Sequence, residues 1–252
     1  MPFQIDLAGR RALVTGAGQG VGRSVAGHLA RAGAHVLVND VVEARAAEVV
    51  AEIRADGGEA GMMCFDVTDR DAVAEAVRAA GRVDILVNNA GNAGADGWKS
   101  NVPFAETAPA DWEPFLKVNL LGPMHTTHSV LPAMTAQGWG RIITIVSDAG
   151  RVGEPRLAAY GAAKAGAAGF ARSVAREVGR FGVTVNNVSL GSMNTPATAG
   201  RGADHPALKR YAIRRFGEPE DAAGMVVYLA SDLAEWVTGQ TFAVNGGYSM
   251  TL

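Results

Sequence analysis

The chain has 252 residues with 23 basic and 25 acidic side chains, a net charge of -2, which gives no reason to expect nucleic acid or another polyanion as partner. Its single cysteine, Cys64, excludes a disulfide within the chain and fits a reducing, cytoplasmic compartment. Cys64 lies in an apolar run, so we expect it to be buried. The N-terminus does not resemble a signal peptide, and no apolar run reaches the roughly 18 residues that a membrane span needs.

Short apolar runs alternate with longer helical patterns along the whole chain. Several runs are apolar on both faces, as strands buried in a parallel sheet are. The expected strands are 12–15, 35–39, 61–65, 84–87, 141–146, 183–188 and 241–244, and the expected helices are one starting near Val21 and those at 44–55, 71–80, 112–134, 160–178 and 221–230. This alternation predicts an α/β fold with a doubly wound, seven-stranded parallel sheet and helices on both faces. No linker interrupts it, so residues 1–252 are expected to form a single domain.

A glycine-rich loop follows the first expected strand. Glycines let the backbone turn tightly and approach a pyrophosphate, and the helix that follows offers unpaired N–H groups to that anion. The pattern differs from the common G-x-G-x-x-G form, because Val21 stands where that form has glycine. We expect a dinucleotide site here, with contacts from Gly16, Gly18, Gln19, Gly20, Val21 and Gly22.

Asp40 ends the second expected strand. A carboxylate at this place can accept hydrogen bonds from the adenosine ribose and would repel a 2′-phosphate. No basic residue stands at Gln19 or Val41 to receive such a phosphate, and Arg23 and Arg45 are expected on solvated helix positions. The sequence therefore predicts that NAD(H) is preferred over NADP(H).

Tyr160 and Lys164 are spaced so that a helix would stack the phenol and the amine on one face. An ammonium beside a phenol favours the phenolate, so we expect Lys164 to lower the pKa of Tyr160 from its usual value of about 10. Such a phenol could act as a general acid or base near neutral pH. The same spacing is also common on solvated helix faces.

Taken together, these features resemble the short-chain dehydrogenase/reductase family in its single-domain branch. Beyond the glycine-rich loop and the Tyr160–Lys164 pair, the matching motifs are Asp66-Val67, Asn88-Asn89-Ala90-Gly91, Asn119, Ser147, Gly191–Thr195, 215–219, 238–240 and 245–247. The resemblance implies a Rossmann-type fold, NAD(P)-dependent hydride transfer and a homotetramer. Two departures stand out, because Leu190 replaces the usual proline before Gly191 and Asn245 replaces the commoner aspartate.

The resemblance also implies roles for individual residues. Tyr160 would exchange a proton with the substrate oxygen, and Ser147 would hydrogen-bond that oxygen as charge develops on it. Lys164 would lower the pKa of Tyr160 and bind the nicotinamide ribose, while Asn119 would hold a water that links Lys164 to solvent. The remaining cofactor contacts that the resemblance implies are Asp66, Val67, Asn89, Ala90, Gly91, Gly191, Met193 and Thr195.

Substrate information is sparser. Residues 147–153 are similar to those of hydroxyacyl-thioester dehydrogenases of the family, which together with the 3-oxoacyl reductases are the nearest comparison. Residues 92–105, with Trp98 and Lys99, could form a pocket wall or a surface excursion, and the basic residues of 201–215 could meet an anionic carrier or face solvent. His125 and His128 have no further ligand at metal spacing, so no catalytic metal is expected. The tryptophans Trp112, Trp139 and Trp236 are expected to pack.

We therefore predict an NAD(H)-dependent oxidoreductase acting on a secondary alcohol or ketone, with hydroxyacyl or oxoacyl thioesters as one substrate class. One alternative is an NADPH-dependent ketone or 3-oxoacyl reductase. The alternative of another class is a dinucleotide-binding regulator without turnover, against which the set Asn119, Ser147, Tyr160 and Lys164 argues. The many small residues of the helix that carries Tyr160 indicate either a subunit interface or tight packing inside the monomer.

Overall fold

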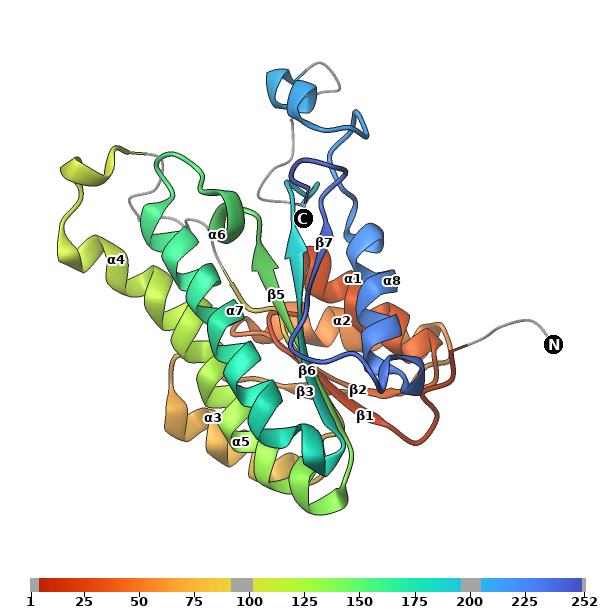
Figure 1. The fold of residues 1–252 in the computed structure, drawn as a ribbon. Coiled ribbons are helices and arrows are strands. Elements are labelled where there is room, and N and C mark those ends of the chain that lie inside the picture. Colours follow the sequence, from red (N-terminus) through yellow and green to blue (C-terminus); the bar gives the residue numbers. More distant parts are fainter. Residues whose placement is uncertain (1–4, 92–101, 196–204, 251–252) are drawn as a thin grey trace.

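The computed structural model describes residues 5–91, 102–195 and 205–250. They form one parallel sheet in the order β3-β2-β1-β4-β5-β6-β7, with helices on both of its faces (Figure 1). The strands are β1 Arg11–Val14, β2 His35–Asn39, β3 Ala60–Met63, β4 Ile85–Asn88, β5 Gly140–Ser147, β6 Val183–Leu190 and β7 Thr241–Val244. The predicted doubly wound, seven-stranded fold is confirmed.

The helices follow the order that the sequence predicts, with short additions. They are α1 Gly20–Arg31, α2 Glu43–Ala55, α3 Arg70–Ala80, α4 Pro109–Leu116, α5 Gly122–Gln137, α6 Ala149–Val152, α7 Ala158–Val178 and α8 Pro219–Ala230. The structure is helical over the whole predicted range 112–134, but a π-helical segment, Lys117–Leu121, separates α4 from α5. Such segments are rare and often lie at functional sites.

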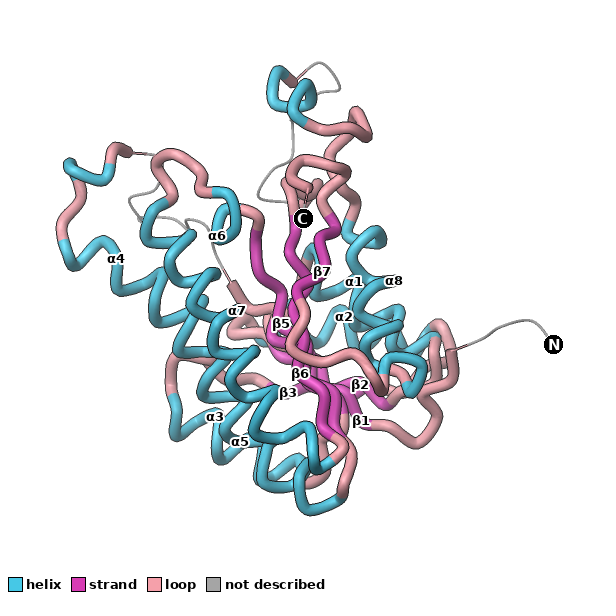
Figure 2. The backbone as a smooth tube through the Cα atoms, viewed as in Figure 1, coloured by secondary structure: helices cyan, strands magenta, loops and turns pink. Residues whose placement is uncertain are grey.

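Two hydrophobic layers hold the helices to the sheet. One contains residues of α1, α2 and α8, and the other contains residues of α3, α5 and α7. Side chains alternate along a strand, so Val14 of β1 packs in the first layer and Leu13 in the second. Figure 2 shows the strands between these two groups of helices. The central strands are therefore buried on both faces and mostly apolar, although β6 also buries the polar side chains Thr184, Asn186, Asn187 and Ser189.

The small residues of α7 serve packing within the monomer at several positions. A Cβ on Gly161 would lie 2.9 Å from the carbonyl oxygen of Ala149 in α6, and one on Gly166 would lie 3.3 Å from Leu120. Helix α6 can therefore approach α7 closely at Gly161, and the π-helical segment at Gly166, because these positions lack a side chain. Of the two interpretations left open by the sequence, packing inside the monomer accounts for these two glycines.

Two packing predictions are wrong. Cys64 is exposed, because it follows β3, the strand at the edge of the sheet that no further strand covers. Trp236 is 97% exposed, in the connection from α8 to the opposite edge strand, β7. Within the described part of the chain, no helix is both long and apolar enough to cross a membrane.

Candidate active site

The glycine-rich loop lies at the carboxyl end of β1 and leads into α1. A Cβ on Gly22 would lie 2.3 Å from the carbonyl oxygen of Gly16 and 2.4 Å from Nδ2 of Asn89, so only glycine fits there. The Asn89 amide donates to the carbonyl oxygens of Thr15 and Gly16, both at 2.9 Å. The backbone N–H of Ala90 donates to Thr15 Oγ1 at 3.0 Å. The Asn89-Ala90 motif after β4 therefore braces the loop from the neighbouring strand.

Asp40 is buried at the end of β2, with its carboxylate turned onto the protein backbone. Its Oδ2 accepts from the N–H of Gly18 at 3.1 Å, and its Oδ1 accepts from the N–H of Val42 at 2.9 Å. Beside it, a Cβ on Gly18 would lie 2.6 Å from Cβ of Arg45, at the start of α2. Arg45 is exposed, and within the described residues its guanidinium has no hydrogen bond or ion pair, whereas its backbone N–H donates to the carbonyl oxygen of Val42 at 3.1 Å.

Asp66 and Val67, the predicted adenine contacts, follow β3. Asp66 is exposed and its Oδ1 accepts from the N–H of Thr68 at 2.8 Å. Val67 is buried, and its carbonyl oxygen bonds Nδ1 of His125 in α5 at 3.0 Å. These contacts fix the turn after β3, and the adenine role of the pair stays a prediction.

Tyr160 and Lys164 lie on α7 and face the end of β5. The Nζ of Lys164 donates to the carbonyl oxygen of Ile145 at 2.8 Å and lies 5.9 Å from the centroid of the Tyr160 ring. Burial lowers the pKa of Lys164 to about 8. The amine is therefore held between the phenol and β5, where it loses its proton far more easily than an exposed lysine.

The pKa of Tyr160 does not follow the sequence prediction. Burial of the phenol raises its pKa, and a hydrogen bond with the Ser147 side chain opposes that change without reversing it. Lys164 donates to the carbonyl oxygen of Ile145, with Nζ 5.9 Å from the ring centroid. Because the pKa of Tyr160 is raised, the predicted lowering is wrong for this arrangement. Ser147 itself accepts from the N–H of Ala149 at 3.2 Å.

Asn119 lies in the π-helical segment and is fully buried. Its Nδ2 donates to the carbonyl oxygen of Phe115 at 3.0 Å. A Cβ on Gly91 would lie 2.8 Å from Oδ1 of Asn119 and 2.9 Å from Nζ of Lys164. Gly91 therefore leaves the space in which the Asn119 amide and the Lys164 amine approach each other, as their predicted roles require.

The loop Gly191–Thr195 extends from β6 toward the glycine-rich loop. Its Ser192 N–H donates to the hydroxyl of Tyr211 at 3.0 Å, and Met193 forms an isolated parallel bridge with Gly217. A Cβ on Gly20 would lie 3.4 Å from Cγ2 of Thr195. The two loops that are predicted to bind the cofactor thus lie next to each other. Tyr211 carries no motif and was missed from the sequence.

A pocket lies beside Tyr160. The rings of Phe104 and Trp112 stack in its wall with centroids 5.1 Å apart, and Arg156 lines it with Tyr160. Arg156 has a φ of 68°, the left-handed region that non-glycine residues rarely adopt. The residues from 102 to 105 thus contribute to a pocket wall, whereas Trp98 and Lys99 lie outside the described residues.

The basic residues of 201–215 that the structure describes are largely engaged with the protein. Arg210 pairs with Glu154 at 3.0 Å, and Arg215 pairs with Asp221 at 2.5 Å. Arg214 donates to the carbonyl oxygen of Lys209 at 2.9 Å, while Arg201 lies outside the described residues. These contacts favour a structural role over the reception of an anionic carrier.

Comparisons with known proteins give a consistent set of relatives. A family model described as enoyl-(acyl carrier protein) reductase matches residues 16–249. A 3-oxoacyl-[acyl-carrier-protein] reductase of Synechocystis sp. is 40% identical over 250 residues, which cover 97% of this chain and 98% of that protein.

Two solved structures are also similar. A putative NAD(P) dependent gluconate 5-dehydrogenase from Beutenbergia cavernae is 40% identical with a TM-score of 0.90, covering 98% of this chain and 99% of that one. A gluconate 5-dehydrogenase from Burkholderia cenocepacia is 32% identical with a TM-score of 0.90, covering 99% and 98%. The first holds NADP at low occupancy, and the second holds NADP and tartrate.

These bound cofactors overturn the NAD(H) preference that the sequence predicts from Asp40. The structure offers a physical reason. Both oxygens of the carboxylate are committed to backbone N–H groups, which partly neutralise the repulsion expected against a phosphate. Arg45, whose guanidinium has no partner in the part of the chain that the structure describes, lies directly beside the glycine-rich loop.

Proposed function

Because the chain belongs to the short-chain dehydrogenase/reductase family, whose members are oxidoreductases of hydroxyl and keto groups, we propose that it reduces 3-oxoacyl thioesters with NADPH. The convergence of Ser147, Tyr160, Lys164 and Asn119 at the end of β5 carries this proposal. The name of the Synechocystis relative and the family model support the acyl thioester as substrate. The aromatic wall of Phe104 and Trp112 beside Tyr160 suits an acyl chain.

The chain's own residues fit a dinucleotide. Side chains at Gly16, Gly18 or Gly22 would collide with neighbouring atoms, so the loop keeps a bare backbone that a pyrophosphate can approach. Gly191–Thr195 would hold the nicotinamide end, and Lys164 the adjacent ribose. When bound, the cofactor supplies the hydride.

Proton delivery falls to Tyr160. Its pKa is raised by burial, so it holds its proton until a carbonyl oxygen gains negative charge. Ser147 accepts from the N–H of Ala149 and keeps its own O–H to donate a hydrogen bond to that oxygen. Lys164, with a pKa of about 8, can return a proton to the phenol near neutral pH, and Asn119 orients the path to solvent.

For the 2′-phosphate of NADPH we assign Arg45. It is exposed, it lies beside Gly18, and its guanidinium has no partner within the described residues. Arg45→Gln is expected to raise the KM for NADPH about tenfold or more and to leave that for NADH unchanged, since a charge-assisted bond to a phosphate is lost. Arg23→Gln is the matched control, because Arg23 already pairs with Glu48 and Glu52. Equal losses in both variants would refute the assignment.

The reaction itself is tested with acetoacetyl-coenzyme A and NADPH, followed by loss of NADPH absorbance. Tyr160→Phe is expected to abolish turnover while the affinity for NADPH, measured by fluorescence titration, stays within about twofold. An unmodified protein that binds NADPH but reduces no oxoacyl thioester would refute the proposed substrate. Undiminished turnover by Tyr160→Phe would refute the role of the phenol.

The solved relatives support a second candidate, oxidation of gluconate or a similar hydroxy acid. The relative from Burkholderia cenocepacia holds tartrate, a hydroxy acid, and the exposed Arg156 at the pocket could pair with a carboxylate. Oxidation of gluconate with NADP⁺, compared with thioester reduction by kcat/KM, separates the two. Arg156→Met should impair gluconate oxidation more than reduction of an uncharged oxo ester.

The homotetramer and the single domain over residues 1–252 stay predictions. Sedimentation velocity tests the first, and limited proteolysis that yields no stable fragment would support the second. A monomeric protein with full activity would show that the site is complete within one chain.

A further inference from the structure

The residue after Ser147 is a buried aspartate with an unusually complete set of partners. Asp148 is 2% exposed. Its Oδ1 accepts from Oγ of Ser189 at 2.7 Å and from Arg151 at 3.1 Å. Its Oδ2 accepts from Nδ2 of Asn245 at 2.5 Å and from Oγ of Ser249 at 2.8 Å. A carboxylate offers about four acceptor sites, and all are used. We call these five residues the Asp148 cluster.

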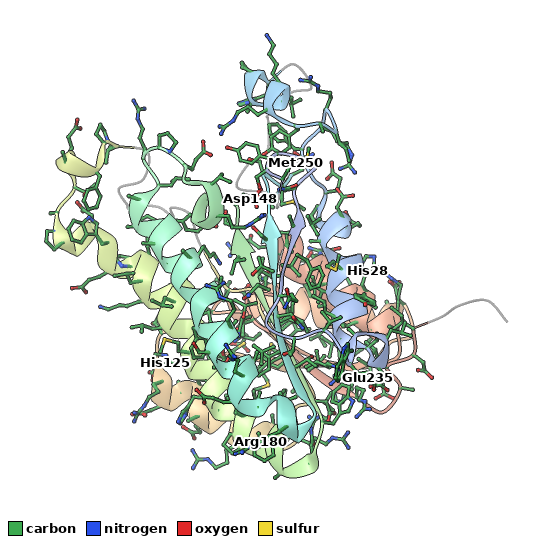
Figure 3. All side chains as sticks on the ribbon, viewed as in Figure 1. His28, His125, Asp148, Arg180, Glu235 and Met250 are labelled. Atoms are coloured by element: carbon green, nitrogen blue, oxygen red, sulfur yellow. The ribbon has the colours of Figure 1, made fainter. Side chains whose placement is uncertain are left out.

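The Asp148 cluster joins three separate parts of the chain. Ser189 comes from β6, Arg151 from α6, and Asn245 and Ser249 from the segment after β7. Figure 3 places Asp148 at the end of the strands, close to the C-terminal segment that carries Met250. The backbone takes part as well, because the N–H of Asp148 donates to the carbonyl oxygen of Leu190 at 3.0 Å. The segment Ser147-Asp148 at the end of β5, which we call the Ser147 loop, is therefore tied to β6 and to the C-terminal segment.

The same cluster supports the loop predicted to contact the nicotinamide. A Cβ on Gly191 would lie 3.2 Å from Cα of Asn245, and the N–H of Gly191 donates to the carbonyl oxygen of Val244 at 3.3 Å. Asn245 thus touches the start of Gly191–Thr195 on one side and holds Asp148 on the other. One residue connects the supports of Ser147 and of the cofactor loop.

Both departures from the family pattern become understandable at this point. Leu190 lacks the rigid ring of proline, so the loop after it needs another constraint, which the Asp148 cluster supplies. An aspartate at position 245 would bring a second carboxylate within 2.5 Å of Asp148, and two such charges cannot both remain ionised there. The neutral amide of Asn245 is therefore the donor that Asp148 requires.

We propose that Asp148 is a positioning residue, whose carboxylate fixes the distance between the Ser147 loop and the Gly191–Thr195 loop. The side chain acts through Ser147 and through Asn245 and needs no contact with substrate. The inference rests on the proposed hydride transfer, but not on the identity of the substrate, since the same two loops would serve reduction of a ketone or oxidation of an alcohol.

The experiment exchanges the two side chains. Asn245→Asp places two carboxylates together, and kcat is expected to fall about tenfold to a hundredfold at pH 8, the range for a small misplacement of reacting groups. Because the pair can share a proton, activity should recover toward pH 6. Asp148→Asn sets two amides against each other and should lose kcat without that recovery. The double variant restores one carboxylate and one amide donor, and its kcat should return to within about threefold of the unmodified protein.

The pH dependence of kcat in Asn245→Asp can be assigned to the two carboxylates once the other groups around Asp148 are considered. The charged group that faces Asp148 is the Arg151 guanidinium from α6, whereas Ser189 from β6 and Ser249 from the C-terminal segment are neutral. Gln240→Glu, an exposed amide-to-carboxyl change just before β7, is the control and should leave kcat and its pH profile unchanged.

The pH profile, the primary isotope effect and the kcat of the double variant separate a positioning role from a general loss of folded protein. A purely structural defect lowers the active fraction but leaves the pH profile and the primary isotope effect with deuterated NADPH unchanged. Displaced loops should slow hydride transfer and so raise the isotope effect. Single variants with the isotope effect and pH profile of the unmodified protein, or a double variant no better than either, would overturn the proposal.

Melting temperature against pH tests the pair without turnover. Asn245→Asp should melt progressively lower as pH rises, and the double variant should not. If the unmodified protein reduces no oxoacyl thioester, the proposed function fails, and kcat is then compared with gluconate and NADP⁺. If the double variant regains the melting temperature of the unmodified protein but not its kcat, measured with whichever substrate the protein turns over, Asp148 is a structural residue and its positioning role is rejected.

Discussion

Lys164 combines deep burial with a charge that the folded protein holds poorly. It is 5% exposed, and burial lowers the pKa of its ammonium from 10.5 to about 8. The unfolded chain, where lysine has its ordinary pKa, therefore binds the proton more tightly than the folded protein. At about 1.36 kcal/mol per pKa unit, keeping the charged form at pH 7 costs the folded state about 3 kcal/mol.

Lys164→Met should thus stabilise the protein at pH 7 while removing its activity. Methionine is uncharged and fills similar space, but it leaves the Ile145 carbonyl oxygen without its donor, a loss of about 1 kcal/mol. We expect a net gain of about 2 kcal/mol at pH 7, or roughly 4–8 °C in Tm for a chain of this size. Above pH 8 the folded protein loses the proton before the unfolded chain does, so the unmodified protein gains stability and the advantage of the variant shrinks.

Urea unfolding of the protein without added cofactor, followed by tryptophan fluorescence at pH 7 and about pH 9.5, measures this difference. Lys117→Met is the control, because Lys117 is exposed and pairs with Glu113 across one helical turn. Its free energy of unfolding should change by less than about 1 kcal/mol at either pH. The reasoning is refuted if Lys164→Met is less stable than the unmodified protein at pH 7, or if its advantage is the same at both pH values.

Two further substitutions test the cofactor loop and the pocket. Gly22→Ala places a Cβ 2.3 Å from the Gly16 carbonyl oxygen, so the affinity for NADPH should fall at least about tenfold. Gly27→Ala on the same helix meets no atom closer than 3.7 Å and should instead raise the stability of the protein by up to about 1 kcal/mol. Fluorescence titration with NADPH and thermal melting check both variants. Trp112→Ala enlarges the pocket beside Tyr160 and should raise kcat/KM for long acyl chains relative to acetoacetyl thioesters, a ratio that would stay constant if the pocket holds no acyl chain.

The fold could be predicted because its signals are local. The central strands are buried on both faces, so most of their residues are apolar whichever helices cover them, and Gly22 must lack a side chain wherever the tight loop occurs. The edges of the sheet are different. Cys64 lies in the same kind of apolar run as a central strand, and only the strand order shows that β3 has no outer neighbour.

The site could be predicted in its composition but not in its electrostatics. A motif supplies Asp40, yet the direction of its carboxylate depends on the N–H groups of Gly18 and Val42. Likewise the spacing of Tyr160 and Lys164 puts both on one face, but it does not show that burial raises the pKa of the phenol and lowers that of the amine, or that the amine donates to the carbonyl oxygen of Ile145. These partners come from separate elements of the fold, so no periodicity in the sequence shows which of them each side chain binds.

The places where the chain departs from ordinary local structure gather around one cleft. The π-helical segment carries Asn119, Arg156 has a left-handed backbone, and Lys164 is a buried cation. Each is unfavourable by itself, and natural chains keep such features mainly where function requires them. Stability alone would favour an apolar side chain in place of Lys164. Its persistence beside Tyr160 and Asn119 is therefore best explained by a proton that must move through this cleft, which a dinucleotide-binding regulator without turnover would not need.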